Sequence, residues 1–334
     1  MTMLRRRCLG IKIVVLSVIT FTMLLFSYPF PDPKRLFKQA SRLLDEPSPP
    51  DLCACPGHCV AELQGHPWFS ERFNGSFYPL LTKENYILSK DTFNWWQRLQ
   101  PSHKAGKFSQ VMEELFALFP GESLFQDAGP GRCRSCAVVG NSGNLKGSYY
   151  GRIIDSNDLV IRMNQAPTQG FEDDVGARTT HHLMYPESAI NLGPNTSLVL
   201  IPFKTLDLQW LINAFTTGTV QQTYRRVMAR IQANREKVMI YSPEFMKYAY
   251  DNWLDKHGRY PSTGFFSLMF ALHICDEVSV FGYGADEQGN WHHYWENDHG
   301  GGLFRQTGVH GGDYEYNITV HLATINKIKM FSGN

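Results

Sequence analysis

The chain has 334 residues, and its 32 lysines and arginines almost cancel its 31 aspartates and glutamates, which leaves a formal net charge of +1. This balance excludes the strong positive field by which nucleic-acid-binding proteins attract their partners. The length suits one large domain.

The N-terminal segment predicts a membrane anchor. Four basic residues within residues 1–12 precede an uncharged, mostly apolar run over residues 13–30, close to the length that a membrane helix needs. A cleaved signal peptide is the alternative, but the run ends without the small residues of a cleavage site. Because more positive charge precedes the run than closely follows it, we expect residues 1–12 in the cytosol and the rest in the lumen, as in a type II membrane protein.

The next segment, residues 31–52, is rich in proline and charge and lacks periodic apolar character. It predicts a stem that links the anchor to a domain over residues 53–334. The start of that domain, from Trp68 to Pro120, has apolar residues at helical spacing and predicts helices.

Seven cysteines are present, and Cys8 lies on the expected cytosolic flank of the anchor. The other six are an even number in an oxidising compartment, which favours disulfides. A zinc site at Cys53, Cys55, His58 and Cys59 is the alternative, but this spacing does not match paired C-x-x-C ligands.

Three N-x-S/T glycosylation sequons, at Asn74, Asn195 and Asn317, all fall on the expected luminal side of the anchor. Their position supports the type II topology.

After Cys136, short β-branched runs alternate with longer polar or amphipathic stretches. Runs that are apolar on both faces and separated by helices predict a parallel sheet covered on both sides, which is an α/β doubly wound fold. Such sheets bind ligands at the carboxyl ends of their strands. The expected strands lie within residues 137–140, 158–164, 197–203, 237–243 and 277–284.

Two of these strands end in polar residues that suit a nucleotide. A turn over residues 140–144 contains two glycines with Asn141 and Ser142, which can approach and bind a phosphate. It lacks the fingerprints of nicotinamide enzymes and of P-loops, and a plain strand-to-helix turn is the alternative. Asn164 ends the next strand and would lie beside Asn141 if the two strands are neighbours; otherwise it caps the following turn.

The start of an apolar helix gives a second candidate site. Ser262, Thr263 and Gly264 precede this helix, and hydroxyl and amide donors at a helix N-terminus form a natural anion site. The alternative is that Ser262 or Thr263 is an ordinary N-cap without a ligand.

Titratable residues gather in a third region, which contains His292, His293, Glu296, His310 and Glu315. Histidine is the side chain best suited to proton transfer near neutral pH, although any single histidine can be structural. Adjacent His292 and His293 cannot easily reach one metal ion, and no H-E-x-x-H or D-x-D arrangement occurs in the chain. No bound divalent metal is therefore expected.

In this order, the segments resemble the sialyl motifs of animal sialyltransferases. The matched segments are the large motif at 136–185, the small motif at 257–282, the third motif at 293–296 and the very small motif at 310–315. Four segments are similar to those of β-galactoside α-2,3-sialyltransferases that act on galactose β1-3 N-acetylgalactosamine. Their sequences are CAVVGNSGNL, THHLMYPES, GRYPSTG and GNWHHYWEN. The resemblance implies a Golgi enzyme with a modified Rossmann-like fold in one catalytic domain, a CMP-sialic acid donor, no metal, and inversion at the anomeric carbon.

The resemblance also implies roles for matched positions. His310 would be the general base on the galactose 3-hydroxyl, and His293 would act on the donor phosphate. The implied donor-binding positions are Asn141, Ser142, Asn164, Ser262, Thr263, Gly264, Gly284, Trp291, Tyr185 and Tyr224, the implied galactose contacts are Gln100 and Tyr260, and the implied disulfides are Cys136–Cys275, Cys55–Cys133 and Cys53–Cys59.

Two rival functions remain at this stage. One is a sialyltransferase that makes another linkage or uses glycolipid instead of glycoprotein acceptors. The other is an inactive, membrane-anchored lectin that keeps the fold; the presence of both His293 and His310 speaks against it.

Overall fold

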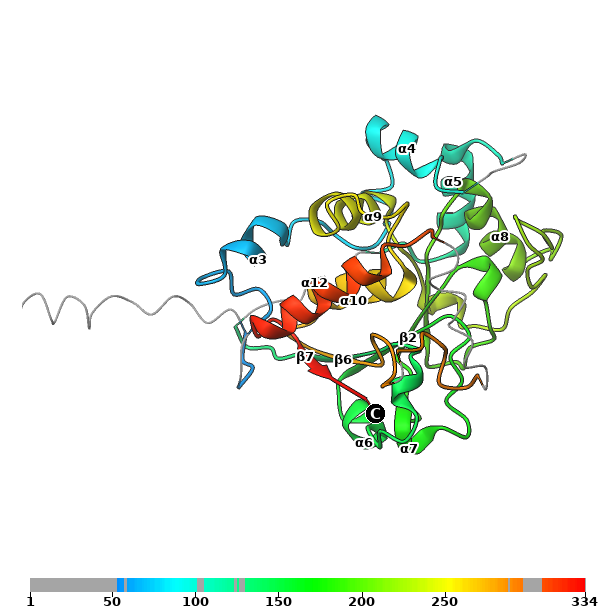
Figure 1. Ribbon diagram of the computed structural model, residues 1–334. Coiled ribbons are helices and arrows are strands. Elements are labelled where there is room, and N and C mark those ends of the chain that lie inside the picture. Colours follow the sequence, from blue (N-terminus) through cyan, green and yellow to red (C-terminus); the bar gives the residue numbers. More distant parts are fainter. Residues whose placement is uncertain are drawn as a thin grey trace, which may run out of the picture. The chain divides into compact units, whose positions relative to one another are not determined.

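A sheet of seven parallel strands forms the centre of the described chain (Figure 1). The computed structural model describes residues 53–333 except 57–58, 101–104, 123–124, 126–129, 288 and 297–307. The strands are β1 (Ser135–Val139), β2 (Leu159–Met163), β3 (His181–Met184), β4 (Ser197–Leu200), β5 (Val238–Ile240), β6 (Glu277–Phe281) and β7 (Lys329–Phe331). Their order is β5-β4-β3-β2-β1-β6-β7, and each neighbouring pair is parallel. The predicted α/β parallel sheet is confirmed.

Two strands were not predicted from the sequence. β3 begins with His181 and His182, which interrupt the apolar pattern, yet both are buried. His181 Nδ1 is hydrogen-bonded to the Thr180 hydroxyl at 3.0 Å, and burial lowers the pKa of each histidine to about 4, so both are neutral in the core. β7 is a short edge strand whose residues are only partly buried.

Helices cover both faces of the sheet. α10 (Thr263–Ile274) packs over β1, β2, β3 and β6, and no residue of this helix is exposed, which explains its almost uniformly apolar sequence. α12 (Gly312–Thr324) packs against β7 on the same side. α6 (Gly151–Asp155) and α7 (Glu172–Val175) lie on the opposite side (Figure 1).

The predicted helical region near the start of the domain contains three short helices, and two of them pack on helices that follow later in the chain. α5 packs on α8, and α4 packs on α9. The bounds are α3 (Pro67–Arg72), α4 (Lys90–Trp96), α5 (Phe108–Leu118), α8 (Thr205–Phe215) and α9 (Pro243–Tyr248), with a π-helical turn η4 (Ala249–Trp253) and 3-10 turns η1 (Gly143–Leu145), η2 (Pro186–Ser188) and η3 (Arg235–Lys237).

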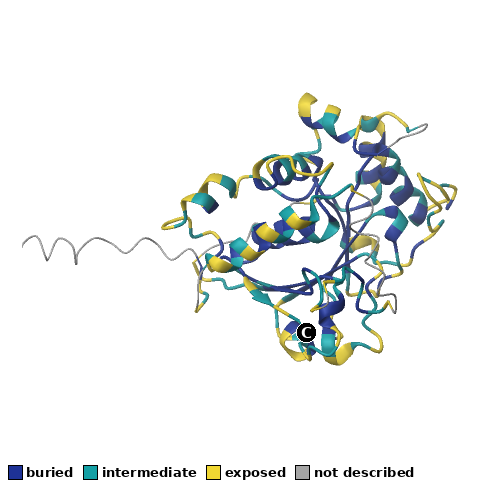
Figure 2. Cartoon of the chain, viewed as in Figure 1, coloured by how far each residue is buried: buried dark blue, intermediate teal, exposed yellow. Residues whose placement is uncertain are grey.

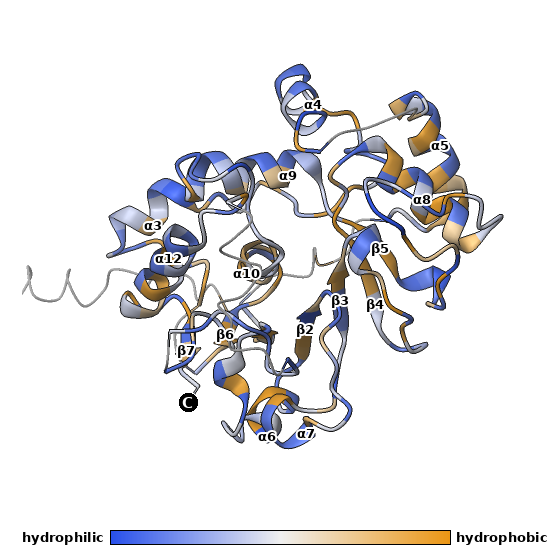
Figure 3. Ribbon diagram, turned by 45° about the vertical axis from the view of Figure 1, so that its right-hand side comes forward, coloured by the Kyte–Doolittle hydropathy of each residue, from blue (hydrophilic) through white to orange (hydrophobic). Residues whose placement is uncertain are grey.

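The core lies between the sheet and these helices. Figure 2 shows the inner strands buried, and Figure 3 shows that the same strands carry apolar residues. Trp96 and Trp210 are fully buried, and each indole N–H donates to a backbone carbonyl at 2.7 Å. The large aromatic rings therefore enter the core without leaving these donors unsatisfied.

The predicted cytosolic tail, membrane anchor and stem over residues 1–52 lie outside the described residues. Within the part of the chain that is described, no helix combines the length and apolar character needed to cross a bilayer. The three sequon asparagines, Asn74, Asn195 and Asn317, are all exposed.

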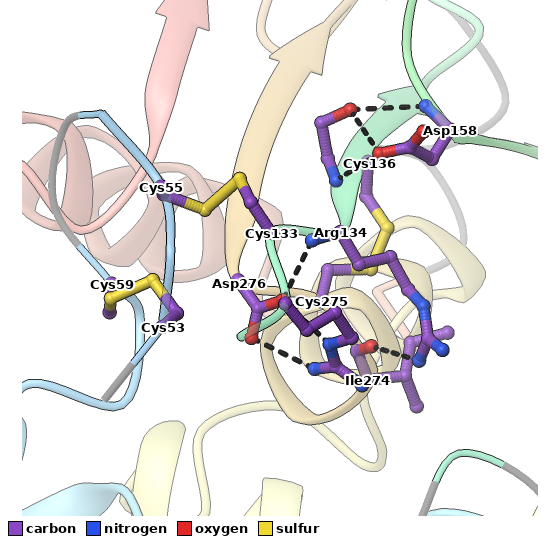
Figure 4. Close-up of polar contacts among 12 residues, drawn as sticks. Cys53, Cys55, Cys59, Cys133, Arg134, Cys136, Asp158, Ile274, Cys275 and Asp276 are labelled. Atoms are coloured by element: carbon purple, nitrogen blue, oxygen red, sulfur yellow. Dashed lines mark hydrogen bonds and ion pairs between the residues drawn. A yellow bond between two sulfur atoms is a disulfide. The ribbon is translucent and has the colours of Figure 1, made fainter. Parts of the chain in front are cut away.

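The six described cysteines pair as the resemblance implies (Figure 4). The pairs are Cys53–Cys59, Cys55–Cys133 and Cys136–Cys275. The last pair joins the start of β1, an inner strand of the sheet, to the end of α10. Next to it, the Asp276 carboxylate accepts two hydrogen bonds from the Arg132 guanidinium, both at 2.8 Å, and one from the Arg134 amide (Figure 4).

Removal of the central disulfide should destabilise the fold most. The Cys136–Cys275 bond closes a loop with a sequence separation of 139, whereas Cys53–Cys59 closes one of 6. Because a longer closed loop restricts the unfolded chain more, Cys136→Ser/Cys275→Ser should lose about 2–5 kcal/mol of unfolding free energy. Denaturant titration would measure this loss. An equal or larger loss in the control Cys53→Ser/Cys59→Ser would contradict the loop argument.

Candidate active site

The turn at the carboxyl end of β1 is tied to the segment of the third motif. The Gly143 amide donates to the His292 carbonyl at 2.8 Å, and the Tyr294 amide donates to the Asn141 carbonyl at 3.0 Å. An isolated bridge joins Ser142 to His293. Two segments far apart in sequence therefore form one unit at the ligand-binding end of the sheet.

Close approach explains the glycines of this unit. A Cβ on Gly143 would lie 2.4 Å from the His292 ring, and one on Gly140 would lie 2.3 Å from the Gly282 carbonyl oxygen. Gly284 has a φ of +88°, and a Cβ there would meet Tyr316 at 2.5 Å. Any larger residue at these positions would clash with neighbouring protein atoms, a constraint separate from the phosphate approach inferred from the sequence.

The two candidate nucleotide-binding asparagines follow neighbouring strands. β1 and β2 pair with Val138 opposite Ile161, and Asn141 and Asn164 each come three residues later. The two strands are therefore neighbours, which is the condition under which the sequence predicted that Asn164 lies beside Asn141. Asn164 adopts a left-handed conformation with φ of 57°, and its carbonyl accepts a hydrogen bond from His182 at 2.6 Å.

The amide oxygens of this region differ in their hydrogen bonding. The Oδ1 of Asn164 accepts from the Ser188 hydroxyl at 3.0 Å. Within the described residues, the buried Oδ1 atoms of Asn141 and Asn144 make no hydrogen bond. A ligand with donor groups would satisfy these oxygens, as buried acceptors require.

The imidazole of His293 is held by its own turn. Its Nδ1 lies 2.7 Å from Glu296 Oε1, and its ring stacks on Trp295 with centroids 4.5 Å apart. Burial raises the pKa of Glu296, but the hydrogen bonds from His293 outweigh burial and leave this pKa lowered overall. The ring orientation of His293 is therefore fixed by a carboxylate on one edge and an indole on one face.

His310 is fixed from the small-motif segment. Its Nδ1 lies 2.9 Å from the Tyr260 carbonyl oxygen, and its ring meets the Tyr260 ring edge-on at 5.2 Å. A carbonyl can only accept, so Nδ1 carries the proton and the neutral ring has its lone pair on Nε2. Burial lowers the pKa of His310, and the bond to the carbonyl opposes this shift only in part. The lowered pKa favours the neutral form of His310, which can accept a proton.

The start of α10 is engaged by protein rather than open. Ser262 is the N-cap, and its hydroxyl accepts from the Phe265 amide at 3.1 Å. Its own amide donates to Glu315 Oε1 at 2.8 Å, and its hydroxyl donates to Glu315 Oε2. Thr263 and Gly264 are the first two residues of the helix. Ser262 is therefore an N-cap, as the alternative interpretation expected. Contact of Ser262, Thr263 and Gly264 with the sugar-nucleotide donor stays a prediction.

Glu315 makes the stability of the protein depend on pH. Burial raises its pKa to about 7 from 4.5, against the Ser262 hydrogen bonds that lower it. Because the pKa of Glu315 is higher in the folded than in the unfolded state, its protonated form contributes about 3 kcal/mol to the free energy of unfolding. This contribution is complete below pH 4.5 and is lost as pH rises through 7. Thermal unfolding from pH 5 to 8 should therefore show a clearly smaller decline in Tm for Glu315→Gln than for the wild type; parallel curves would contradict the assignment.

Four of the remaining candidates are linked, directly or through one neighbour, to Lys204 or the adjacent Phe203, which the sequence analysis did not single out. Lys204 Nζ donates to Gln100 Oε1 at 2.7 Å and lies 5.1 Å from the centre of the Tyr224 ring. The Gln100 amide nitrogen lies 3.4 Å from the Tyr260 hydroxyl. Tyr185 reaches the same place through Phe203, whose ring contacts both Tyr185 and Tyr260. The expected galactose and phosphate contacts thus share one cluster.

Trp291 contacts the last helix, α12. The rings of Trp291 and Tyr316 have their centroids 6.2 Å apart. Tyr316 is also the residue that a Cβ on Gly284 would meet.

Potential metal ligands come together at one place among the described residues. The group is Cys55, Cys133 and Glu277, and its two sulfurs are joined in a disulfide.

Comparison with known proteins identifies the family of the chain. The model of glycosyltransferase family 29 (sialyltransferase) matches residues 80–327. The chain belongs to this family.

Relatives match over most or all of their length. A Gallus gallus protein called CMP-N-acetylneuraminate-beta-galactosamide-alpha-2,3-sialyltransferase 1 is 48% identical over 100% of both chains. A Mus musculus protein of the same name is 56% identical over 84% of this chain and 83% of the relative. A solved mammalian sialyltransferase, also known in complex with Gal-beta-1-3GalNAc-ortho-nitrophenol, is 52% identical over 84% of this chain with a TM-score of 0.79, and the matches cover 99% and 100% of the solved chains.

Proposed function

We propose that the protein transfers sialic acid from CMP-sialic acid to the 3-hydroxyl of galactose in glycans that end in galactose β1-3 N-acetylgalactosamine. The names of the relatives support the donor and the linkage, and the solved complex of a relative supports the acceptor. The observation in the site that carries the proposal is the hydrogen bond from His310 to the Tyr260 carbonyl, which puts the lone pair of the ring on Nε2.

The proposed mechanism is a single displacement. An alcohol is a poor nucleophile, so neutral His310 takes the proton of the galactose 3-hydroxyl as its oxygen bonds to the anomeric carbon of sialic acid. Attack occurs on the face opposite the departing CMP, and the anomeric configuration is inverted. The proton ends on His310 and the electron pair of the broken bond ends on the CMP phosphate.

Departure of CMP needs stabilisation of negative charge. His293 is placed beside the turn over residues 140–144, and as an imidazolium it would donate Nδ1–H to Glu296 and Nε2–H to the phosphate. Amides of the turn and the start of α10 supply further donors in the proposal. These groups do the work that other transferases assign to a metal ion, and we therefore propose a metal-independent reaction.

The proposed location is the Golgi membrane. Residues 1–12 would be cytosolic, residues 13–30 would span the membrane, residues 31–52 would be the stem, and residues 53–334 would form the luminal catalytic domain. The three disulfides and the three exposed sequon asparagines support a luminal domain.

One assay tests the proposal. The full chain, purified in detergent, would be incubated with CMP-sialic acid, a nitrophenyl glycoside of galactose β1-3 N-acetylgalactosamine and EDTA, and the linkage of the product determined. An α2-3-linked product with EDTA present is expected. A different linkage would favour the first rival, a requirement for a divalent cation would refute the metal-free mechanism, and disaccharide binding without CMP release would favour a lectin. The same assay on a glycolipid acceptor decides the preferred carrier.

A further inference from the structure

The side chain of Lys204 is completely buried, which is unusual for lysine. Its Nζ lies 2.7 Å from Asp207 Oδ1, 2.7 Å from Gln100 Oε1 and 3.6 Å from Glu187 Oε1. Asp207 and Glu187 are almost as inaccessible, with side chains 0% and 4% exposed. A buried lysine is tolerated only when its charge is paired in this way.

The cluster sits at the ligand-binding end of the sheet. Lys204 is the residue just before α8, in the loop that follows β4, and Glu187 lies in η2 just after β3. Asp207 is held in the first turn of α8 by a hydrogen bond from the Phe203 amide at 2.8 Å. The charged groups are thus positioned by the segments that follow β3 and β4, and Gln100 lies in the segment that follows α4.

The ammonium decides which way the Gln100 amide faces. A glutamine side chain has one accepting oxygen and one donating NH₂, and an ammonium can only donate. The bond from Lys204 therefore fixes Oε1 inward, which leaves the NH₂ on the side of the Tyr260 hydroxyl, 3.4 Å away. The Tyr260 carbonyl in turn holds His310.

We propose that Lys204 is a positioning residue for the acceptor: it fixes the Gln100 amide with its NH₂ toward the galactose, beside the tyrosine that orients His310. The inference deepens the proposed function and rests on it. Without Lys204 the amide can turn over and present an oxygen, which cannot donate to an acceptor hydroxyl.

Direct binding tests the proposal without requiring turnover. The Kd of the nitrophenyl disaccharide would be measured by calorimetry in the presence of CMP, and the Kd of CMP would be measured separately. Lys204→Met keeps an aliphatic chain against the Tyr224 ring but removes the ammonium, and should weaken disaccharide binding about tenfold, the upper range for one hydrogen bond. CMP binding should stay unchanged.

The coupling between two residues distinguishes orientation from general damage. Gln100→Leu should weaken disaccharide binding to a similar degree, and Lys204→Met should add almost nothing in the Gln100→Leu background. Gln100→Glu, which keeps an acceptor for Lys204 but has no NH₂, serves if Lys204→Met does not fold, and should match Gln100→Leu. Lys247→Met is the matched control, because Lys247 also pairs with two carboxylates, those of Asp91 and Asp251, which are not members of this cluster, and it should bind the disaccharide normally.

Several outcomes would overturn the proposal. Additive effects of the Lys204 and Gln100 substitutions, normal binding by Gln100→Glu, or equal weakening of CMP and disaccharide binding would each reject an orienting role. These results leave the proposed function standing if the wild type forms the α2-3 product. Absence of that product rejects the proposed function instead, whatever the binding cycle shows.

Discussion

Replacement of His310 by alanine is expected to lower kcat by roughly 10²- to 10⁴-fold, the usual contribution of a positioned general base, while CMP binds as it does to the wild type. The reason is the fixed tautomer: the bond to the Tyr260 carbonyl puts the lone pair of the neutral ring on Nε2, and truncation removes this proton acceptor. Steady-state kinetics with the disaccharide and calorimetry with CMP would measure the two effects. Substantial residual turnover would remove His310 from the role of base.

The pH profile gives an independent check on His310. A general base must be unprotonated, and burial lowers the pKa of His310 from 6.5. The rate should therefore hold as pH falls through 6.5 and decline only at lower pH. The residual rate of His310→Ala should lack this acidic decline. The same decline in the variant would assign the titration to another group.

Replacement of His293 by alanine is expected to lower kcat by about 10²- to 10³-fold, the typical cost of removing one donor to a developing negative charge. The KM for the disaccharide should change little, because His293 lies beside the turn over residues 140–144, which is assigned to the sugar donor. Initial-rate kinetics at saturating CMP-sialic acid would measure the loss.

Glu296→Gln is the matched control for His293. It keeps the imidazole stacked on Trp295 and replaces only the carboxylate that holds Nδ1. Its rate loss should be smaller than that of His293→Ala. An unchanged rate in His293→Ala, or a larger loss in Glu296→Gln, would show that the imidazole does not act on the phosphate.

The pattern of apolar runs was enough to predict five strands of the sheet, because β1, β2, β4 and β5 are almost entirely buried, β6 is buried on one face, and all five carry short apolar runs. β3 was missed because His181 and His182 break that pattern, and only tertiary contacts show that they are neutral and satisfied. β7 was missed because an edge strand of three partly exposed residues carries almost no signal.

The candidate site divides in the same way. The adjacency of Asn141 and Asn164 followed from strand order, and the structure has that order. Lys204 could not be found, because a lysine three residues before an aspartate at a helix start is normally a surface pair. The hydrogen bond from the Ser262 amide to Glu315 joins two motifs that are distant in sequence. Residue types alone do not show that these two residues are hydrogen-bonded to each other.

The strand order has a consequence for synthesis. β1 lies between β2, which follows it closely, and β6, which is more than a hundred residues later in the chain. While the nascent chain leaves the ribosome, one side of β1 has no partner strand, and this open edge invites pairing with other chains. A polypeptide that stops early, after β5, keeps that edge permanently. We expect such products to aggregate or to be retained by chaperones.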